Sequence, residues 1–242
     1  MNIQLAERVK CSECPIRHRA VCARCDADEL TVLDQIKTYR SFKAGQTIVW
    51  RGDDLTHVSS VVAGIATLTK TLDDGRMQMV GLLLPSDFIG RPGRASLDFD
   101  VTAASDVTLC SFQRAPFEKL LVETPHISQR LVEMAMDELD AARDWMVLLG
   151  RKTAREKLAS FIQMLVQRSH IPGNDLPQLI LPLTREEIAS YLGLTLETVS
   201  RQFTQFRKDG IVEFSDRRHF TVKDHAALLE ATGDDADGGV LV

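Results

Sequence analysis

Apolar residues between positions 41 and 114 come in short runs that glycine and aspartate interrupt. Val, Ile, Leu and Thr dominate these runs, which is typical of strands. The runs are QTIVW, HVSSVVA, IATLTKTL, MQMVGLLL and VTLCSF. The pair Asp74-Gly75 lies between two of them and indicates a hairpin turn. Many short strands with regular turns predict an antiparallel β-roll, which we place at residues 26–124, with a short helix over 28–37 at its start.

A helical pattern replaces the strand pattern at Pro125. Apolar residues recur there at three- and four-residue steps, which indicates an amphipathic helix over residues 125–150 that ends at Gly150. This apolar stripe is longer than one small roll needs, so we expect it to pair with the same helix of a second copy in a homodimer. The predicted dimer interface comprises Leu131, Ala135, Leu139, Ala142, Met146 and Leu149.

The C-terminal part of the chain carries the signals of two capped helices. Thr184 and Glu187 match a capping box, and their helix ends near Gly193. Thr195 can cap a second helix that runs to Asp209, and two strand-like runs, IVEF and HFTV, follow it. Two helices joined by a short turn that contains glycine, with a hairpin behind them, predict a winged helix-turn-helix.

The remaining segments complete the expected domain organisation. We assign residues 151–232 to the winged helix-turn-helix domain, with another helix over 153–167 and a loop over 170–177. Residues 233–242 are rich in Gly and Asp and are expected to form a disordered acidic tail. Residues 1–25 form a separate cysteine-rich segment. The fold class is therefore α+β, with a β-roll, a long dimerisation helix and a DNA-binding domain in that order.

The second helix of the helix-turn-helix has two distinct faces. The apolar residues of one face should pack inward, and they are Val199, Phe203 and Phe206. The opposite face is polar and is expected to contact DNA through Glu197, Ser200, Arg201, Thr204 and Lys208. Arginine can bond guanine bidentately, and glutamate can accept a hydrogen bond from cytosine. A solvated surface helix is the alternative, but the capped neighbouring helix and the trailing hairpin favour DNA reading.

The distribution of charged and apolar residues indicates which class of protein this chain belongs to. The whole chain carries −5 at pH 7, but residues 151–222 carry 11 Lys and Arg against 8 Asp and Glu, so the predicted DNA-binding domain is locally basic. No apolar run approaches the roughly 18 residues of a membrane helix, and the N-terminus has no apolar signal-peptide core. We therefore expect a cytoplasmic protein. No nucleophile–base pair, phosphate-binding loop or carboxylate pair indicates an enzyme.

The cysteines form the second candidate site. Four of the five lie within residues 11–25, and Cys110 lies far away in the strand-like run VTLCSF. In a reducing cytoplasm such a cluster indicates metal or redox chemistry rather than disulfides. Cys11, Cys14 and Cys22 have the spacing C-x2-C-x7-C, and with Cys110 they can complete a four-thiolate iron–sulfur site.

Two other interpretations use the same cysteines differently. Cys11, Cys14, Cys22 and Cys25 could close a zinc site, although zinc-binding pairs are usually separated by about 12 residues or more, a longer interval than the one here. Cys110 would then be only a buried small hydrophobe. A dithiol redox enzyme needs its C-x-x-C in a βαβ pattern, which this sequence lacks.

The segment LTREEIASYLGLTLETVSRQFTQFRKDGIV resembles the DNA-binding domain of the CRP/FNR family of transcription regulators. Glu197, Ser200 and Arg201 match the E-x-x-S-R core with which the FNR branch reads TTGAT-type half-sites. FKAGQTIVWRGDD, VVAGIATLTKTLDDGRMQMVGLLLPSDFIG and the long helix resemble the family's cyclic-nucleotide-binding-like roll and dimer helix. The resemblance covers nearly the whole chain. It implies a dimeric regulator that binds palindromic double-stranded DNA and works with RNA polymerase.

In the FNR branch, three N-terminal cysteines and one central cysteine hold an oxygen-labile [4Fe–4S] cluster. The resemblance assigns these roles to Cys11, Cys14, Cys22 and Cys110, although the third ligand of the best-known pattern follows the second more closely. Cys25 is the alternative third ligand. The resemblance thus implies an oxygen-responsive global regulator that binds DNA when the cluster is present. A zinc-bearing or redox-blind regulator of the same family is the alternative.

The cyclic-AMP branch of the family has a Glu after G-D-F-x-G and an Arg-Ser pair further on, which bind the ribose and the cyclic phosphate. Here the run reads SDFIGR, so Arg91 stands at the ribose position. Asp100 lies where the phosphate needs a cation and would repel it. We therefore expect no cyclic nucleotide ligand.

Overall fold

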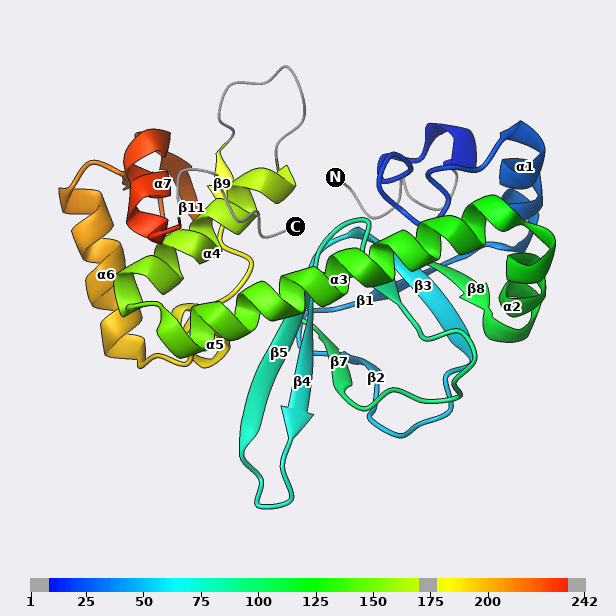
Figure 1. Ribbon diagram of the computed structural model, residues 1–242, viewed down its shortest axis with the longest axis horizontal. Helices are drawn as coiled ribbons and strands as arrows, with labels where there is room; N and C mark the ends of the chain where they lie inside the picture. The colour runs from blue at the N-terminus through cyan, green and yellow to red at the C-terminus, as the bar shows by residue number, and fades with distance from the viewer. Residues whose placement is uncertain (1–8, 170–177, 235–242) are drawn as a thin grey trace. The chain divides into compact units, whose positions relative to one another are not determined.

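The computed structural model describes residues 9–169 and 178–234 (Figure 1). The chain divides into two compact units, residues 1–135 and 136–242, and each is described by itself. No helix in the described ranges is long and apolar enough to cross a membrane.

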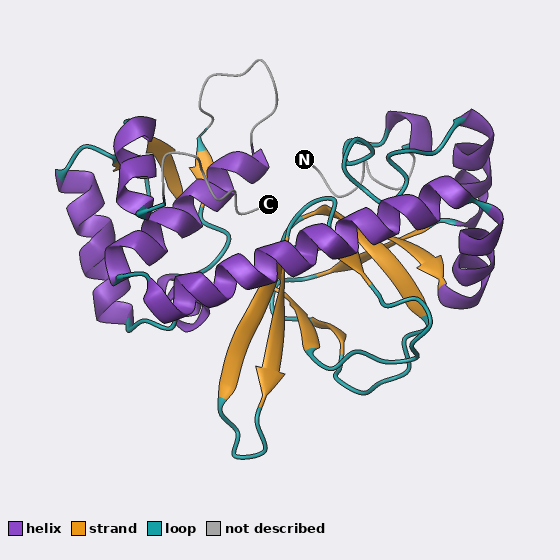
Figure 2. Cartoon of the chain, viewed as in Figure 1, coloured by secondary structure: helices purple, strands orange, loops and turns teal. Residues whose placement is uncertain are grey.

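Unit 1 is built on two antiparallel sheets of four strands each (Figure 2), with the orders β1-β8-β3-β6 and β2-β7-β4-β5. The predicted antiparallel roll is therefore confirmed. Its strands are β1 (Thr38–Phe42), β2 (Thr47–Val49), β3 (His57–Ala63), β4 (Ala66–Thr71), β5 (Met77–Leu83), β6 (Phe88–Ile89), β7 (Asp100–Ala103) and β8 (Val107–Gln113). Gly75 turns the β4–β5 hairpin with φ of 86°, a backbone conformation that glycine adopts at low cost.

The helices of unit 1 flank the roll at both ends of its sequence. They are the 3-10 helix η2 (Cys11–Glu13), α1 (Ala27–Ile36), α2 (Arg114–Glu123) and the first part of α3 (Pro125–Arg151). Asp26 caps α1, and its side chain accepts hydrogen bonds from the backbone N–H groups of Asp28 and Glu29. The sequence analysis missed α2. Pro125 separates it from α3, because proline suits the first turn of a new helix.

The core of unit 1 includes part of the cysteine-rich segment. Val58, Val61 and Leu109 from the strands are fully buried in one apolar cluster. Ile16, Ala20 and Val21 from the segment belong to the same cluster. Residues 9–25 are therefore held against the roll by ordinary apolar burial, in addition to any role of their cysteines.

Unit 2 contains the winged helix-turn-helix that the sequence predicts. Its elements after α3 are α4 (Ala154–Ser169), β9 (Leu179–Ile180), α5 (Arg185–Leu192), α6 (Leu196–Lys208), β10 (Val212–Phe214), β11 (His219–Val222) and α7 (His225–Thr232). Strands β10, β11 and β9 form a small antiparallel sheet in that order. The sequence analysis missed α7, an apolar helix that packs on α4.

Two predicted irregular segments fall mostly outside the described residues. The loop expected over 170–177 lies outside them, and so does the tail from residue 235. The first two residues of the predicted tail, Gly233 and Asp234, belong to the described part of the chain. Gly233 ends α7 in the left-handed conformation, and the Asp234 carboxylate lies 2.5 Å from Lys152 Nζ. Gly233 is therefore the C-cap of α7, a position where glycine is common because it adopts this conformation at low cost.

Candidate functional site

Four of the five cysteines line one pocket of unit 1. They are Cys11, Cys14, Cys22 and Cys110, and the rest of the wall includes Leu33, Tyr39, Ser60 and Phe112. Cys25 is buried but is not among the residues that line this pocket. All five cysteines are free thiols. The structure thus brings the remote Cys110 to the three N-terminal cysteines that the sequence predicts as its partners.

Local structure explains how each thiol reaches the pocket. Cys11 begins η2, and its backbone N–H donates to Asp34 Oδ1 of α1 at 2.9 Å. Cys14 ends the same short helix. Cys22 precedes a tight turn in which its carbonyl accepts the Cys25 N–H. Cys110 lies within β8 between the neighbouring strands β1 and β3, which hold its backbone on both sides.

Burial raises the pKa of four of the cysteine thiols, Cys11, Cys22, Cys25 and Cys110. It raises the pKa of Cys11 to about 12, although the nearby Lys37 ammonium opposes the shift. It also raises the pKa of Cys22 and Cys110, and the neighbouring thiols add to both shifts. For Cys25 burial raises the pKa to about 12, and the thiol with the largest influence there is Cys22. A metal must displace such protons, so metal binding here would release acid.

The pocket's donor set suits a soft metal centre. Four thiols converge among apolar walls, which is the chemistry that iron–sulfur clusters and zinc require. Ser60 Oγ is buried in the same wall and has no hydrogen-bond partner within the described residues. A sulfur acceptor in the pocket would satisfy that hydroxyl, because a buried donor without a partner is unfavourable.

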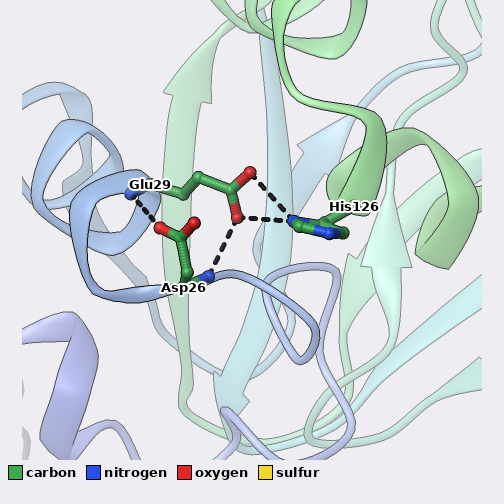
Figure 3. Close-up of side chains that lie close together, drawn as sticks. All are labelled: Asp26, Glu29 and His126. Atoms are coloured by element: carbon green, nitrogen blue, oxygen red, sulfur yellow. Dashed lines mark hydrogen bonds and ion pairs between the residues drawn. The ribbon is translucent and has the colours of Figure 1, made fainter.

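A second group of metal-ligating residues has a structural explanation. In the described ranges, the one set of three or more such side chains whose donor atoms all lie within 4.8 Å is Asp26, Glu29 and His126 (Figure 3). Asp26 and Glu29 form the capping box of α1, so their oxygens already accept backbone N–H groups. His126 Nδ1 lies 3.0 Å from both Glu29 oxygens and joins the start of α3 to α1.

The cysteine-rich segment is also tied to the first part of α3. Arg130 Nη2 donates to the Arg19 carbonyl at 2.9 Å, and Glu133 pairs with Arg24 at 2.7 Å. Arg130 also lies 3.3 Å from Glu133. Two neighbouring residues of α3 therefore hold the loop that carries Cys22, and nothing in the sequence pattern indicated these contacts.

The recognition helix α6 has the two faces that its sequence predicts. Val199, Phe203 and Phe206 are buried, and Phe203 packs edge-on against Phe214 of β10. Gly193 closes the preceding helix with φ of 61°, and the Thr195 hydroxyl caps α6 by accepting the Thr198 N–H. Both caps fix where α6 starts, and therefore which of its residues stand at the exposed N-terminal turns.

The predicted DNA-contacting residues lie on the outer side of α6. Glu197, Arg201, Thr204 and Lys208 are exposed, and Ser200 is half-buried. The Thr204 hydroxyl donates to the Ser200 carbonyl at 2.9 Å, one helical turn back. Thr204 therefore keeps only its oxygen lone pairs and its methyl group for contact with a base, whereas the other four side chains form no hydrogen bond or ion pair within the described residues.

Comparisons with known proteins agree with this architecture. Residues 39–124 match the model of the cyclic nucleotide-binding domain, and residues 156–231 match that of the Crp-like helix-turn-helix domain. The chain is 59% identical to the transcriptional activator protein FnrL of Cereibacter sphaeroides over 96% of both chains. It is also 41% identical to the nitrogen fixation regulation protein FixK of Bradyrhizobium diazoefficiens, over 84% of this chain and 85% of FixK. The chain belongs to the CRP/FNR family of transcription regulators.

A solved structure supports the same assignment. FixK2 from Bradyrhizobium japonicum superposes with a TM-score of 0.76 at 32% sequence identity, covering 83% of this chain and all of FixK2. These relatives are regulators and not enzymes, as the sequence analysis expected for this member of the CRP/FNR family. The helix-turn-helix makes DNA its partner.

The residues predicted for the dimer interface of this CRP/FNR regulator separate into two groups. Ala135, Leu139, Ala142 and Met146 are exposed on α3. Leu131 is half-buried against the core of unit 1. Leu149 is also half-buried, and its Cδ2 would lie 3.8 Å from a Cβ placed at Gly193 in the helix-turn-helix turn. Leu131 and Leu149 each pack in part within their own unit and keep part of their surface exposed, so their place in the dimer interface stays a prediction.

Exposed apolar residues of α3 that the prediction omitted complete its outer stripe. Val132, Met136 and Val147 have exposed fractions of 61%, 52% and 55%. Val132, Leu139 and Met146 follow one another at seven-residue intervals, the repeat of a coiled-coil seam. That repeat was visible in the sequence and could have identified the stripe.

The roll positions tied to cyclic nucleotide binding in other members look different here. Arg91 is exposed. Asp100 begins β7, and its carboxylate accepts the backbone N–H of Arg51 at 2.8 Å. The match to the cyclic nucleotide-binding domain does not specify a ligand, so the expectation that the roll binds no cyclic nucleotide stays a prediction.

Proposed function

We propose that this regulator is an oxygen-responsive transcriptional activator whose cysteine pocket holds a [4Fe–4S] cluster. In this proposal it binds palindromic TTGAT-type DNA sites as a homodimer when the cluster is present. The observation that carries the proposal is the pocket itself, in which four cysteines from distant parts of the chain converge. Its similarity to FnrL, a transcriptional activator by name, points the same way.

Cys11, Cys14, Cys22 and Cys110 would hold the cluster. When bound, it supplies iron and sulfide that oxygen can attack. The choice of Cys22 over Cys25 rests on the pocket wall, which includes Cys22 and not Cys25. Cys25 would remain a spare thiol next to the site.

The spacing of the sulfurs favours this centre over a closed zinc site. Four thiolates around one zinc at about 2.3 Å lie about 3.8 Å from one another. In the described part of the chain, no cysteine belongs to a set of three or more ligands within 4.8 Å of one another. A zinc site using Cys25 would also leave Cys110 unused, although Cys110 lines the pocket with the other three.

Contacts within unit 1 suggest how the pocket acts on α3. A filled pocket would fix residues 11–25, and Arg130 and Glu133 would carry that order to the first part of α3 through Arg19 and Arg24. The exposed apolar stripe of α3 would then be held in the conformation that packs against the same stripe of a second copy. Loss of the cluster would release this restraint and weaken the dimer.

DNA reading and activation complete the proposal. Glu197, Ser200 and Arg201 would contact base edges, Thr204 would contact a neighbouring base, and Lys208 would meet phosphate. The bound dimer would recruit RNA polymerase in the cytoplasm, where the thiols stay reduced. A zinc-bearing or redox-blind regulator remains the competing function.

Anaerobic purification tests the cluster directly. The protein should be brown and carry about four irons and four sulfides per chain. Replacing Cys11, Cys14, Cys22 or Cys110 by Ser should abolish the colour, whereas Cys25→Ser, the matched control from the same loop, should retain most of it. A colourless anaerobic protein with one zinc per chain would contradict the proposal and support the zinc-bearing alternative.

A further inference from the structure

Lys37 places a cation next to a predicted cluster ligand. It follows α1 directly, and its side chain is only 11% exposed. Its Nζ lies 3.7 Å from Cys11 Sγ and 2.6 Å from Asp34 Oδ1. The same Asp34 oxygen accepts the backbone N–H of Cys11 at 2.9 Å. Both members of the Lys37–Asp34 pair therefore contact Cys11, Lys37 at the sulfur and Asp34 at the backbone N–H.

Lys37 is a largely buried lysine whose charge is paired with Asp34. Lysine is rarely buried unless its charge is paired, because the ammonium loses its hydration. Here the ammonium lies beside Asp34, over the Tyr39 ring at 5.4 Å, and it also donates to the Val9 carbonyl. Tyr39 lines the thiol pocket, so the lysine lies at the edge of the site that would hold the cluster.

We propose that Lys37 is the counter-cation of the iron–sulfur site and that Asp34 positions it. Four thiolates outweigh the positive charge of the iron–sulfide core, so the occupied site carries net negative charge in a buried pocket. A hydrogen bond from an ammonium to a ligand sulfur stabilises that charge. This inference rests on the proposed function, because it assigns a residue to the same cluster.

The inference predicts an effect on redox potential as well as on occupancy. Reduction of the bound [4Fe–4S] core from the 2+ to the 1+ state adds one electron and therefore one negative charge. A cation at a ligand sulfur stabilises the reduced state more than the oxidised state, which raises the potential. Lys37→Met should therefore shift the one-electron midpoint potential to a more negative value.

The test uses the full-length protein, reconstituted with iron and sulfide under anaerobic conditions. Lys37→Met, Lys37→Arg and Asp34→Asn are compared with wild type by spectroscopic redox titration and by the rate of iron transfer to a chelator without oxygen. Lys43→Met is the matched control, because Lys43 forms a similar pair with Asp106 on the exposed surface of the same unit. We expect a negative potential shift and several-fold faster iron loss for Lys37→Met, substantial recovery in Lys37→Arg, faster iron loss without a negative potential shift for Asp34→Asn, and wild-type behaviour for Lys43→Met.

Each contrary result has a distinct meaning. A wild-type potential and iron-release rate in Lys37→Met would overturn the role of Lys37 and leave the cluster proposal intact. If Lys37→Met takes up no cluster, uptake is measured in Lys37→Gln and Lys37→Arg. Uptake by Lys37→Arg alone would support the role of Lys37 as counter-cation. Uptake by both variants would overturn that role. A wild-type protein that takes up no iron and sulfide would overturn both proposals.

Discussion

Cys22 and Cys25 show how strongly the surroundings decide the role of a residue. Both lie in one loop, both are free thiols, and burial raises the pKa of both. Only Cys22 belongs to the pocket that Cys11, Cys14 and Cys110 share. A spacing pattern could not separate them, because either one gives a plausible interval from Cys14.

At the same scale, Arg201 is the residue with the clearest expected role in reading sequence. Arg201→Ala should remove one bidentate base contact and cost about 1–3 kcal/mol on a TTGAT-type half-site. In a dimer the loss occurs twice, so specific binding should fall by about thirtyfold or more. Competition binding between the palindrome and half-site variants, at fixed salt and without oxygen, measures this loss of affinity.

Lys208→Ala is the matched comparison on the same helix. If Lys208 contacts phosphate, its loss should weaken all DNA sequences about equally and reduce the salt slope by about one per contact. The proposed division of roles fails if Arg201→Ala weakens specific and random DNA to the same extent.

Asp216 lies in the turn between β10 and β11, and its carboxyl is expected to make the stability of the folded protein depend on pH. Hydrogen bonds from the backbone N–H groups of His219 and Arg218, both 2.7 Å long, lower the pKa of this carboxyl from 3.8 to about 2. The charged carboxylate therefore stabilises the folded turn above the unfolded pKa, and this contribution is lost as the pH falls from 4 toward 2. Asp216→Asn should remove the contribution.

Denaturant unfolding of wild type and Asp216→Asn between pH 7 and pH 3 measures the difference. The stability advantage of the wild type should shrink as the pH falls below about 4. An advantage that grows as the pH falls from 4 to 3 would contradict this assignment of the sign.

Among the elements, α3 has apolar residues on two faces. The face with Leu131 packs against the core of unit 1, and the outer stripe with Val132, Leu139 and Met146 is exposed. A helix with two apolar faces can stabilise its own unit and still offer a surface to a second copy. The periodicity alone could not assign each leucine to a face.

Leu139→Glu tests the outer face of α3. A charge buried in an apolar seam should cost about 2 kcal/mol or more of association free energy. Sedimentation equilibrium of the anaerobic protein should therefore show a weaker dimer. Leu131→Ala is the matched control: it should lower the free energy of unfolding by about 2 kcal/mol and change association less. The assignment of faces is wrong if Leu131→Ala weakens the dimer more than Leu139→Glu does.

For the whole molecule, the proposal links oxygen to assembly. Air exposure should move the anaerobic protein from dimer toward monomer at matched salt and concentration, as sedimentation velocity would report. A change of only a few kcal/mol is enough to shift such an equilibrium. Cys110→Ser should behave as a monomer even without oxygen, and Cys25→Ser should respond as wild type. An unchanged mass on air exposure would remove the dimer switch but not DNA binding.

Local patterns made most of the elements predictable. The helix-turn-helix, its caps and its wing follow from short-range signals, because a cap or a turn depends on residues only a few positions apart. Most of the longer strands were also found, since each lies in a run rich in Val, Ile, Leu and Thr. The elements that the sequence pattern did not indicate are the strands β1, β6, β7 and β9, the 3-10 helix η2 and the helices α2 and α7.

The sequence by itself determined the family, the order of the domains and the set of cysteines available to bind a metal. The tertiary structure decided which four cysteines share a pocket, which leucines of α3 remain exposed, and that Lys37 and Asp34 flank Cys11. The physical reason is the distance along the chain over which the deciding interactions act. Caps and turns are set by neighbours in the chain, whereas a pocket wall forms only when β8, α1 and the N-terminal loop bury their apolar residues in one core.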